Sequence, residues 1–116
     1  MIFTKSQILE KAGLVRDICN IVLFPKKVEK ILLIGSYASG KQTDWSDIDL
    51  LIQLPRTEFR IEYPSWEQIA EIHQKLGTNR VHVIFGTVEC AESLHQKHKG
   101  KEKDYSYKEL SLQGGY

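Results

Sequence analysis

Residues 35–50 read GSYASGKQTDWSDIDL. Gly35-Ser36 ends a short apolar run and Asp47-Ile48-Asp49 begins the next one, with ten residues between Ser36 and Asp47. A glycine has no side chain, so backbone N–H groups can approach an anion closely, and the Ser36 hydroxyl can add a donor to a phosphate oxygen. The stretch therefore predicts two strands joined by a turn that contacts phosphate.

Asp47 and Asp49 stand two residues apart at the start of the second predicted strand. Alternate side chains of a strand point to the same face, so the two carboxylates repel each other unless a cation lies between them. Mg²⁺ is the natural candidate, because it takes carboxylate oxygens, retains water and bridges to phosphates. Lys41 in the turn could steer a triphosphate or could be an ordinary solvated lysine. A hairpin with an aspartate-rich turn is the simpler alternative, but it does not explain why both motifs flank one turn.

The rest of the chain alternates helices with short apolar strands. Thr4-Lys5-Ser6-Gln7 and Ser65-Trp66-Glu67-Gln68 are capping boxes, in which a hydroxyl and a glutamine satisfy free backbone N–H groups at a helix start. An apolar stripe at helical spacing follows each box. The stripes are Ile8, Ala12, Val15, Cys19 and Val22, and Trp66, Ile69, Ala70, His73 and Leu76. The predicted elements are a helix between Thr4 and Pro25, strands over 28–34 and 48–54, a helix from 66 to 76, a strand over 81–85 and a helix over about 88–97.

The composition suits a globular protein rather than a fibrous or disordered one. The 116 residues predict a single domain over 1–116, with a core over about 5–97 and a polar C-terminal tail over about 98–116. The net charge of +1 gives no overall basic field, so we expect no direct nucleic-acid binding. No apolar run approaches the roughly 20 residues of a spanning helix, so we expect no membrane association and a cytoplasmic location. Cys19 and Cys90 are predicted to be buried thiols.

The motif Gly35-Ser36, ten residues, then Asp47-Ile48-Asp49 resembles the signature of the DNA polymerase β-like nucleotidyltransferase superfamily. The short length resembles its minimal nucleotidyltransferases, often called MNT proteins. This resemblance implies an α+β fold, similar to an α/β sandwich, with a central mixed β-sheet flanked by helices. It also implies a nucleoside triphosphate, usually ATP, together with Mg²⁺. Carried onto this chain, Gly35 and Ser36 contact the triphosphate, with Lys41 as a further candidate, and Asp47 and Asp49 are catalytic metal ligands.

The resemblance further implies a partner. MNT proteins frequently pair with a HEPN-domain protein, commonly as its antitoxin, and some transfer AMP from ATP to a tyrosine of the HEPN toxin. A domain this small leaves little surface to enclose an acceptor, which also favours a partner protein. Alternatives are a catalytically weak or inactive fold that binds its partner through shape, and a stand-alone transferase with a small acceptor. Association of this chain with copies of itself, as a homo-oligomer, is a further possible interaction. Candidate contacts are Phe59, Ile61 and Tyr63, or Tyr105, Tyr107 and Leu110, although self-packing explains them about as well.

One position departs from the family pattern. Active members usually carry a third carboxylate near the start of the next core strand, where this chain has His82. Imidazole is a poor Mg²⁺ ligand, although a neutral ring can accept a proton. Three interpretations stay open: a weak or inactive site that still binds nucleotide, a working site with His82 as catalytic base, or a different alignment in which Glu58 or Glu62 supplies the acid. His73 is predicted to lie at the core edge, and His95 and His98 lack a partner that would support a metal site.

Overall fold

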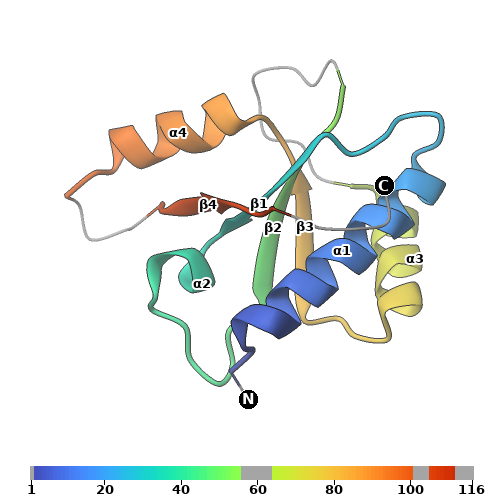
Figure 1. Ribbon diagram of the computed structural model, residues 1–116, viewed down its shortest axis with the longest axis horizontal. Coiled ribbons are helices and arrows are strands. Elements are labelled where there is room, and N and C mark those ends of the chain that lie inside the picture. Colours follow the sequence, from blue (N-terminus) through green and yellow to red (C-terminus); the bar gives the residue numbers. More distant parts are fainter. Residues whose placement is uncertain (1, 56–63, 101–104, 112–116) are drawn as a thin grey trace.

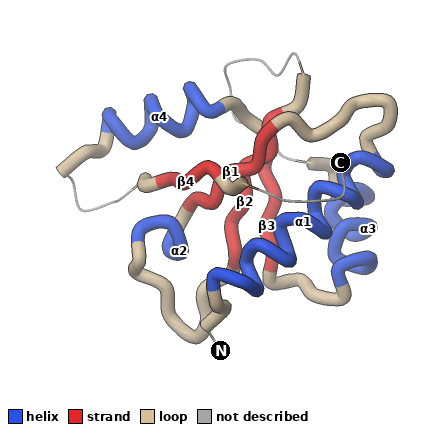
Figure 2. The backbone as a smooth tube through the Cα atoms, in the orientation of Figure 1, coloured by secondary structure: helices blue, strands red, loops and turns tan. Residues whose placement is uncertain are grey.

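A computed structural model of the chain describes residues 2–55, 64–100 and 105–111. Figure 1 shows a central sheet with helices on both faces, and Figure 2 shows where loops join these elements. The elements, in chain order, are α1 (Lys5–Val22), β1 (Lys30–Ile34), α2 (Ser36–Ser39), β2 (Ile48–Gln53), α3 (Trp66–Leu76), β3 (Val81–Phe85), α4 (Val88–Lys97) and β4 (Tyr107–Glu109). This mixed α+β architecture confirms the predicted fold class.

The sheet has four strands in the order β3-β2-β1-β4. β1 pairs antiparallel with both β2 and β4, whereas β2 and β3 run parallel because α3 returns the chain between them. The register places Ile34 opposite Asp49 on one side and opposite Tyr107 on the other. Asp49 in turn lies opposite His82 on β3. The sheet is therefore mixed, as the resemblance implied, and it aligns the beginnings of β2 and β3.

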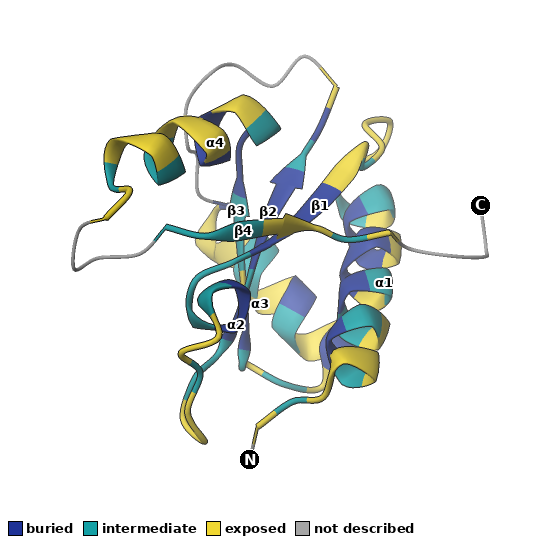
Figure 3. Cartoon of the chain, turned by 60° about the vertical axis from the view of Figure 1, so that its left-hand side comes forward, coloured by how far each residue is buried: buried dark blue, intermediate teal, exposed yellow. Residues whose placement is uncertain are grey.

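The two faces of the sheet are covered differently. α1 and α3 lie together on one face, and α4 lies on the other (Figure 1). The main core forms under α1 and α3, where Val15 and Cys19 meet the strand residues Leu50 and Ile52. A smaller cluster of Leu32, Leu51 and Ala91 forms under α4. The outer side of α4 is exposed (Figure 3), and an open cavity lies beside it on this side of the sheet.

The helix starts follow from the capping boxes. Thr4 and Ser65 each accept the backbone N–H three residues later, and the glutamine at that position accepts the cap residue's own N–H. The buried stripe of α1 is confirmed, since Ala12, Val15 and Cys19 are fully buried. The stripe predicted for α3 is confirmed at Leu76, which is buried, but it is wrong at Trp66 and Ala70, which are exposed. Trp66 is 85% exposed, because the helix turns Ile72 toward the core together with Leu76.

Two short elements differ from the expectation. The predicted turn after Gly35 contains the one-turn helix α2, closed by Gly40 in the left-handed conformation. β4 brings part of the expected polar tail into the sheet as an edge strand, and the self-packing left open for Tyr107 and Leu110 is found: Tyr107 packs against the cluster under α4 and Leu110 against the main core. Phe59, Ile61 and Tyr63 lie outside the described residues.

Both cysteines are free and buried, as predicted. Burial raises the pKa of the Cys19 thiol to about 11, so it stays protonated at neutral pH. None of the helices within residues 2–55, 64–100 and 105–111 combines the length and hydropathy needed to cross a membrane.

Candidate active site

Gly35 makes the turn from β1 into α2 with a backbone that only glycine adopts readily. Its φ of 72° and ψ of −153° lie in a region that side chains essentially exclude. Its carbonyl accepts the N–H groups of Ala38 and Ser39, both at 3.1 Å, which starts the short helix. A Cβ atom at Gly35 would also collide with Oδ2 of Asp49. The absence of a side chain therefore brings this backbone directly against the Asp49 carboxylate.

His82 lies between the two aspartates. Its Nε2 is 3.2 Å from Oδ2 of Asp47, and its Nδ1 is 3.3 Å from Oδ1 of Asp49. Neutral imidazole carries one N–H, whereas imidazolium carries two, so the doubly protonated ring satisfies both carboxylates. The structure thus brings together the three candidate catalytic residues, and the ring occupies the side on which a cation would meet the carboxylates. Its place opposite Asp49 matches the predicted strand alignment, and Glu58 and Glu62 lie outside the described residues.

The Asp49 carboxylate has a perturbed acidity. Partial burial raises the pKa of Asp49 above its ordinary value of 3.8, and the negative charge of Asp47 raises it further. His82 acts in the opposite direction without cancelling the effect. An ionised Asp49 is therefore costly in this fold, which is the condition that a bound cation would relieve.

Arg80 is a further residue of the site that sequence reasoning did not single out. Its guanidinium donates to the backbone carbonyls of Asp44 and Ser46, and its Nε lies 3.5 Å from Oδ1 of Asp47. Its cationic carbon also lies 4.7 Å from the centre of the Phe3 ring. Arg80 thus ties the loop before β2 to the start of β3. Its position two residues before His82, hence on the same side of the chain, is the signal that could have revealed it.

The loop that carries Asp47 is also held internally. The backbone N–H of Thr43 donates to the Ser46 hydroxyl at 2.9 Å, and the Ser46 N–H donates back to the Thr43 carbonyl at 3.1 Å. The Trp45 N–H donates to the Thr43 hydroxyl, while the Trp45 side chain is 89% exposed. Asp47 therefore follows a turn that is held by its own hydrogen bonds, and these bonds fix the backbone from which the Asp47 carboxylate projects.

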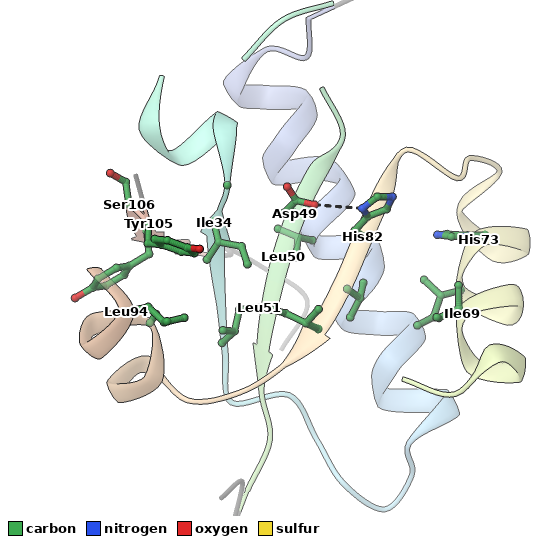
Figure 4. Close-up of a pocket in the computed structure, with 16 residues that line it drawn as sticks. Ile34, Asp49, Leu50, Leu51, Ile69, His73, His82, Leu94, Tyr105 and Ser106 are labelled. Carbon is green, nitrogen blue, oxygen red and sulfur yellow. Dashed lines mark ion pairs between the residues drawn. The ribbon is translucent and has the colours of Figure 1, made fainter. Parts of the chain in front are cut away.

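An open cavity of about 570 Å³ adjoins these residues; it lies along the α4 side of the sheet and extends past β3 to α3, whose Ile69, Ile72 and His73 also line it. Asp49 and His82 lie at one part of it, and Tyr105, Ser106 and Leu94 lie across the sheet from them (Figure 4). Gly35 also lines the cavity, whereas Ser36 and Lys41 are not among its lining residues. Its floor is apolar. The floor residues are Ile34, Leu51 and Ile84.

The remaining histidines have structural contacts. His73 is half-buried, and its Nε2 lies 3.0 Å from the Val81 carbonyl, which suits a residue at the core edge. His95 meets Tyr107 edge-on at 6.0 Å, and His98 lies 4.4 Å from the Tyr105 ring, measured between ring centres. In the described parts of the chain, no three His, Cys, Asp or Glu side chains are grouped so as to hold a metal ion.

The carboxylate pair nevertheless fits Mg²⁺ better than it fits a transition metal. Mg²⁺ takes one or two protein carboxylates and completes its shell with water and phosphate oxygens, so it does not need three protein ligands. Asp47 and Asp49 both contact the His82 ring, each at a different nitrogen, so the two carboxylates lie on the same side of the sheet beside one cationic or polar group. The Gly35 backbone packs so closely against the Asp49 carboxylate that no side chain fits between them, so the turn and the carboxylate are direct neighbours.

Comparison with known proteins agrees with this geometry. Residues 15–110 match the family described as the nucleotidyltransferase domain, so the chain belongs to that family. It is 40% identical over 50 residues to "Putative protein adenylyltransferase MJ1379" of Methanocaldococcus jannaschii, a match that covers 43% of this chain and 46% of that protein. The matched region thus spans about half of the relative's length. No solved structure matches the chain.

The family indicates a general class of chemistry. A nucleotidyltransferase domain implies a nucleoside triphosphate as substrate, and such domains generally use a divalent metal ion. This agrees with the nucleotidyl-transfer class predicted from the sequence.

Replacing Gly35 by alanine should damage both fold and site. The backbone conformation alone should cost about 1–3 kcal/mol in the free energy of unfolding, and the added Cβ must push Asp49 aside. Gly40→Ala is the matched control, because Gly40 also has positive φ but a Cβ there would meet nothing within 4 Å. Urea denaturation and ATP titration should show Gly35→Ala losing stability and binding. Equal binding by the two variants would contradict the close approach.

Replacing Arg80 by glutamine should loosen the loop that carries Asp47. Hydrogen bonds from a charged donor contribute about 1.5–3 kcal/mol each, and Arg80 donates to two loop carbonyls. We expect lower stability and an affinity for ATP with Mg²⁺ that falls several-fold. Arg80→Lys keeps the charge but not the planar fork, so it should resemble Arg80→Gln. Wild-type affinity in Arg80→Gln would show that the loop holds Asp47 without this residue.

Proposed function

We propose that this chain binds ATP with Mg²⁺ at Asp47 and Asp49 and transfers AMP to a tyrosine of a HEPN-domain partner, for which it serves as the antitoxin. The observation that carries the nucleotide part is the contact of the Gly35 turn with the Asp49 carboxylate, at one edge of an open cavity. The backbone that would approach the phosphates then lies next to the carboxylates that would bind the metal ion. Nucleotidyl transfer requires these two parts to be adjacent.

The roles of the chain's own residues follow from their places. Gly35 and Ser36 would contact the triphosphate with backbone N–H groups and a hydroxyl, and the exposed Lys41 would attract its charge from the loop after α2. Asp47 and Asp49 would hold Mg²⁺. When bound, that ion would neutralise phosphate charge and help to orient the α-phosphorus. Arg80 would keep Asp47 in position while nucleotide enters and leaves.

The proposal that the acceptor belongs to a partner protein rests on other observations. The relative is named as a protein adenylyltransferase, which makes a protein the acceptor in that protein. In this chain the cavity is open on one side, and the second sheet face is only partly covered by α4. An acceptor from another protein could therefore reach the α-phosphorus without rearrangement of the core. Tyrosine as the acceptor and HEPN as the partner come from the resemblance of the motif.

A second candidate function is supported by His82. A ring that already bridges both carboxylates can take the place of the cation, which favours a site that binds nucleotide weakly or transfers slowly. The protein would then neutralise its partner by forming a complex. A stand-alone transferase with a small acceptor is the third candidate.

One co-incubation separates these functions. The neighbouring reading frame is inspected for a HEPN protein, both chains are expressed together, and the complex is treated with Mg²⁺ and ATP labelled at the α-phosphate. Label on a partner tyrosine supports the proposal. A stable unlabelled complex that suppresses toxicity supports the second candidate, and absence of any complex contradicts the antitoxin role.

A further inference from the structure

Four residues form a continuous row across the sheet. The pairing runs from Tyr107 on β4 to Ile34 on β1, then to Asp49 on β2 and His82 on β3. Directly paired residues point to the same face of a sheet, so all four share the face that carries the open cavity. All four also line that cavity. The row places a tyrosine on the same floor as the candidate metal ligands.

The separation along this row suits a direct approach. Neighbouring strands lie about 4.8 Å apart, so the backbones at Tyr107 and Asp49 are separated by about 10 Å. Only Ile34 stands between them, and its apolar side chain forms part of the floor. A phenol ring lying over Ile34 spans much of that distance, and a nucleotide held at Asp49 fills the rest.

The surroundings of Tyr107 support a reactive position rather than a purely structural one. The ring is half-buried, rests on the apolar cluster under α4 and meets His95 edge-on at 6.0 Å between ring centres. Within the part of the chain that the structure describes, no side-chain hydrogen bond of the Tyr107 hydroxyl is seen. The ring is thus supported by packing, and Tyr107 is one of the residues that line the cavity.

We propose that Tyr107 is an adenylyl acceptor within the chain itself, so that the protein modifies its own cavity. This inference rests on the proposed nucleotidyl transfer from ATP. The phenol oxygen attacks the α-phosphorus and forms a new P–O bond, while the bond from that phosphorus to the α,β-bridging oxygen breaks. Pyrophosphate leaves with the electron pair, and the phenol proton passes to solvent. The products are O-adenylyl-Tyr107, pyrophosphate and one proton.

Self-modification has a consequence for the site. The attached AMP would occupy the same cavity that nucleotide enters, so the modified chain should bind fresh ATP poorly. It would also cover the face through which an external acceptor arrives. Modification at Tyr107 therefore restrains the transferase once partner is scarce, because transfer within one chain needs no second protein.

The test uses the isolated full chain with Mg²⁺ and ATP labelled at the α-phosphate. Intact-mass measurement counts adenylyl groups, and peptide mapping of the wild type locates the modified residue without relying on any variant. Tyr107→Phe and Tyr105→Phe are compared, since Tyr105 also lines the cavity but precedes β4 and lies outside the row. Thermal melts establish that each variant is folded, and calorimetry measures ATP binding in the same preparations.

We expect one adenylyl group per chain, mapped to Tyr107, at a first-order rate that does not depend on protein concentration. Tyr107→Phe should lose labelling by at least about tenfold, a free-energy difference of about 1.4 kcal/mol, while Tyr105→Phe keeps it. Label at another residue, or none despite ATP binding and partner modification, would overturn this inference and leave the proposed function intact. Absence of ATP binding would overturn both.

Discussion

Asp49→Asn is expected to remove most of the effect of Mg²⁺ on ATP binding and to lower AMP transfer by at least about a hundredfold. The amide keeps the shape of the side chain but loses the charge that a divalent ion requires, and metal stabilisation of transition-state charge is worth several kcal/mol. Calorimetric titration of ATP with and without Mg²⁺ measures the first effect, and labelled transfer to the partner measures the second. Equal ATP affinity of the wild type with and without Mg²⁺ would contradict the metal site.

The same substitution should stabilise the protein without ligand. Because the pKa of Asp49 is raised in the folded state above 3.8, ionising it costs folding free energy. That cost is absent well below the ordinary pKa, develops as pH rises through the folded-state value and is constant at neutral pH. Asp49→Asn should therefore match the wild type near pH 3 and exceed its free energy of unfolding at pH 7.

Asp44→Asn is the control for that comparison. The Asp44→Asn substitution removes one negative charge from the same loop, but the Asp44 side chain is not among those that contact His82. The hydrogen bond from Arg80 to the Asp44 backbone carbonyl is retained in this variant. Urea denaturation across pH should show no comparable gain at neutral pH. A gain of equal size in both variants would mean that general charge relief, rather than the buried position of Asp49, sets the stability.

His82→Asp is expected to raise AMP transfer. The substitution removes a ring that spans both carboxylates and supplies the third carboxylate that the family resemblance associates with active members. A stronger negative pocket binds divalent ions more tightly, so the concentration of Mg²⁺ needed for half-maximal transfer should also fall. The cost appears in the ligand-free protein, where three neighbouring carboxylates should lower the melting temperature. Transfer rate against Mg²⁺ concentration and thermal melts measure the two effects.

His82→Ala separates the remaining interpretations. If the ring mainly occupies the cation position, alanine should tighten Mg²⁺ binding and leave transfer low. If the ring is the working base, wild-type transfer is readily measured and alanine should cost about 10²–10⁴ in rate, as loss of a general base does. A rate unchanged by both alanine and aspartate is incompatible with a ring that touches both Asp47 and Asp49.

Much of the local structure could be predicted because its causes are local. The capping boxes at Thr4 and Ser65 begin α1 and α3, and the Thr87 cap begins α4. Gly77 ends α3 in the left-handed conformation that glycine adopts without strain. Trp66 was assigned to the wrong side because spacing alone cannot distinguish a stripe that starts at position 66 from one centred on Ile72.

The candidate site was predictable only in part. The contact of Gly35 with Asp49 and the pairing of Asp49 with His82 depend on the strand register, and the sequence left that register open at His82. The spacing of Arg80 from His82 indicates only that they share a side, and it does not predict its carbonyl partners at Asp44 and Ser46, which lie more than thirty residues away along the chain. Such hydrogen bonds depend on where the loop lies relative to β3 in the folded chain, and the spacing of residues along the sequence does not predict that position.

The sequence by itself determined α1, α3 and α4, three of the strands and the glycine–serine and paired-aspartate motifs, because each depends on neighbouring residues and on backbone chemistry. Tertiary structure decided how these parts meet. It inserted β4 beside β1 through packing of Tyr107 and Leu110, and it brought Arg80 to Asp47. It also aligned Tyr107 with Asp49 across the sheet. Such contacts arise from burial and strand register between distant segments, whose free energies exist only once the chain has folded.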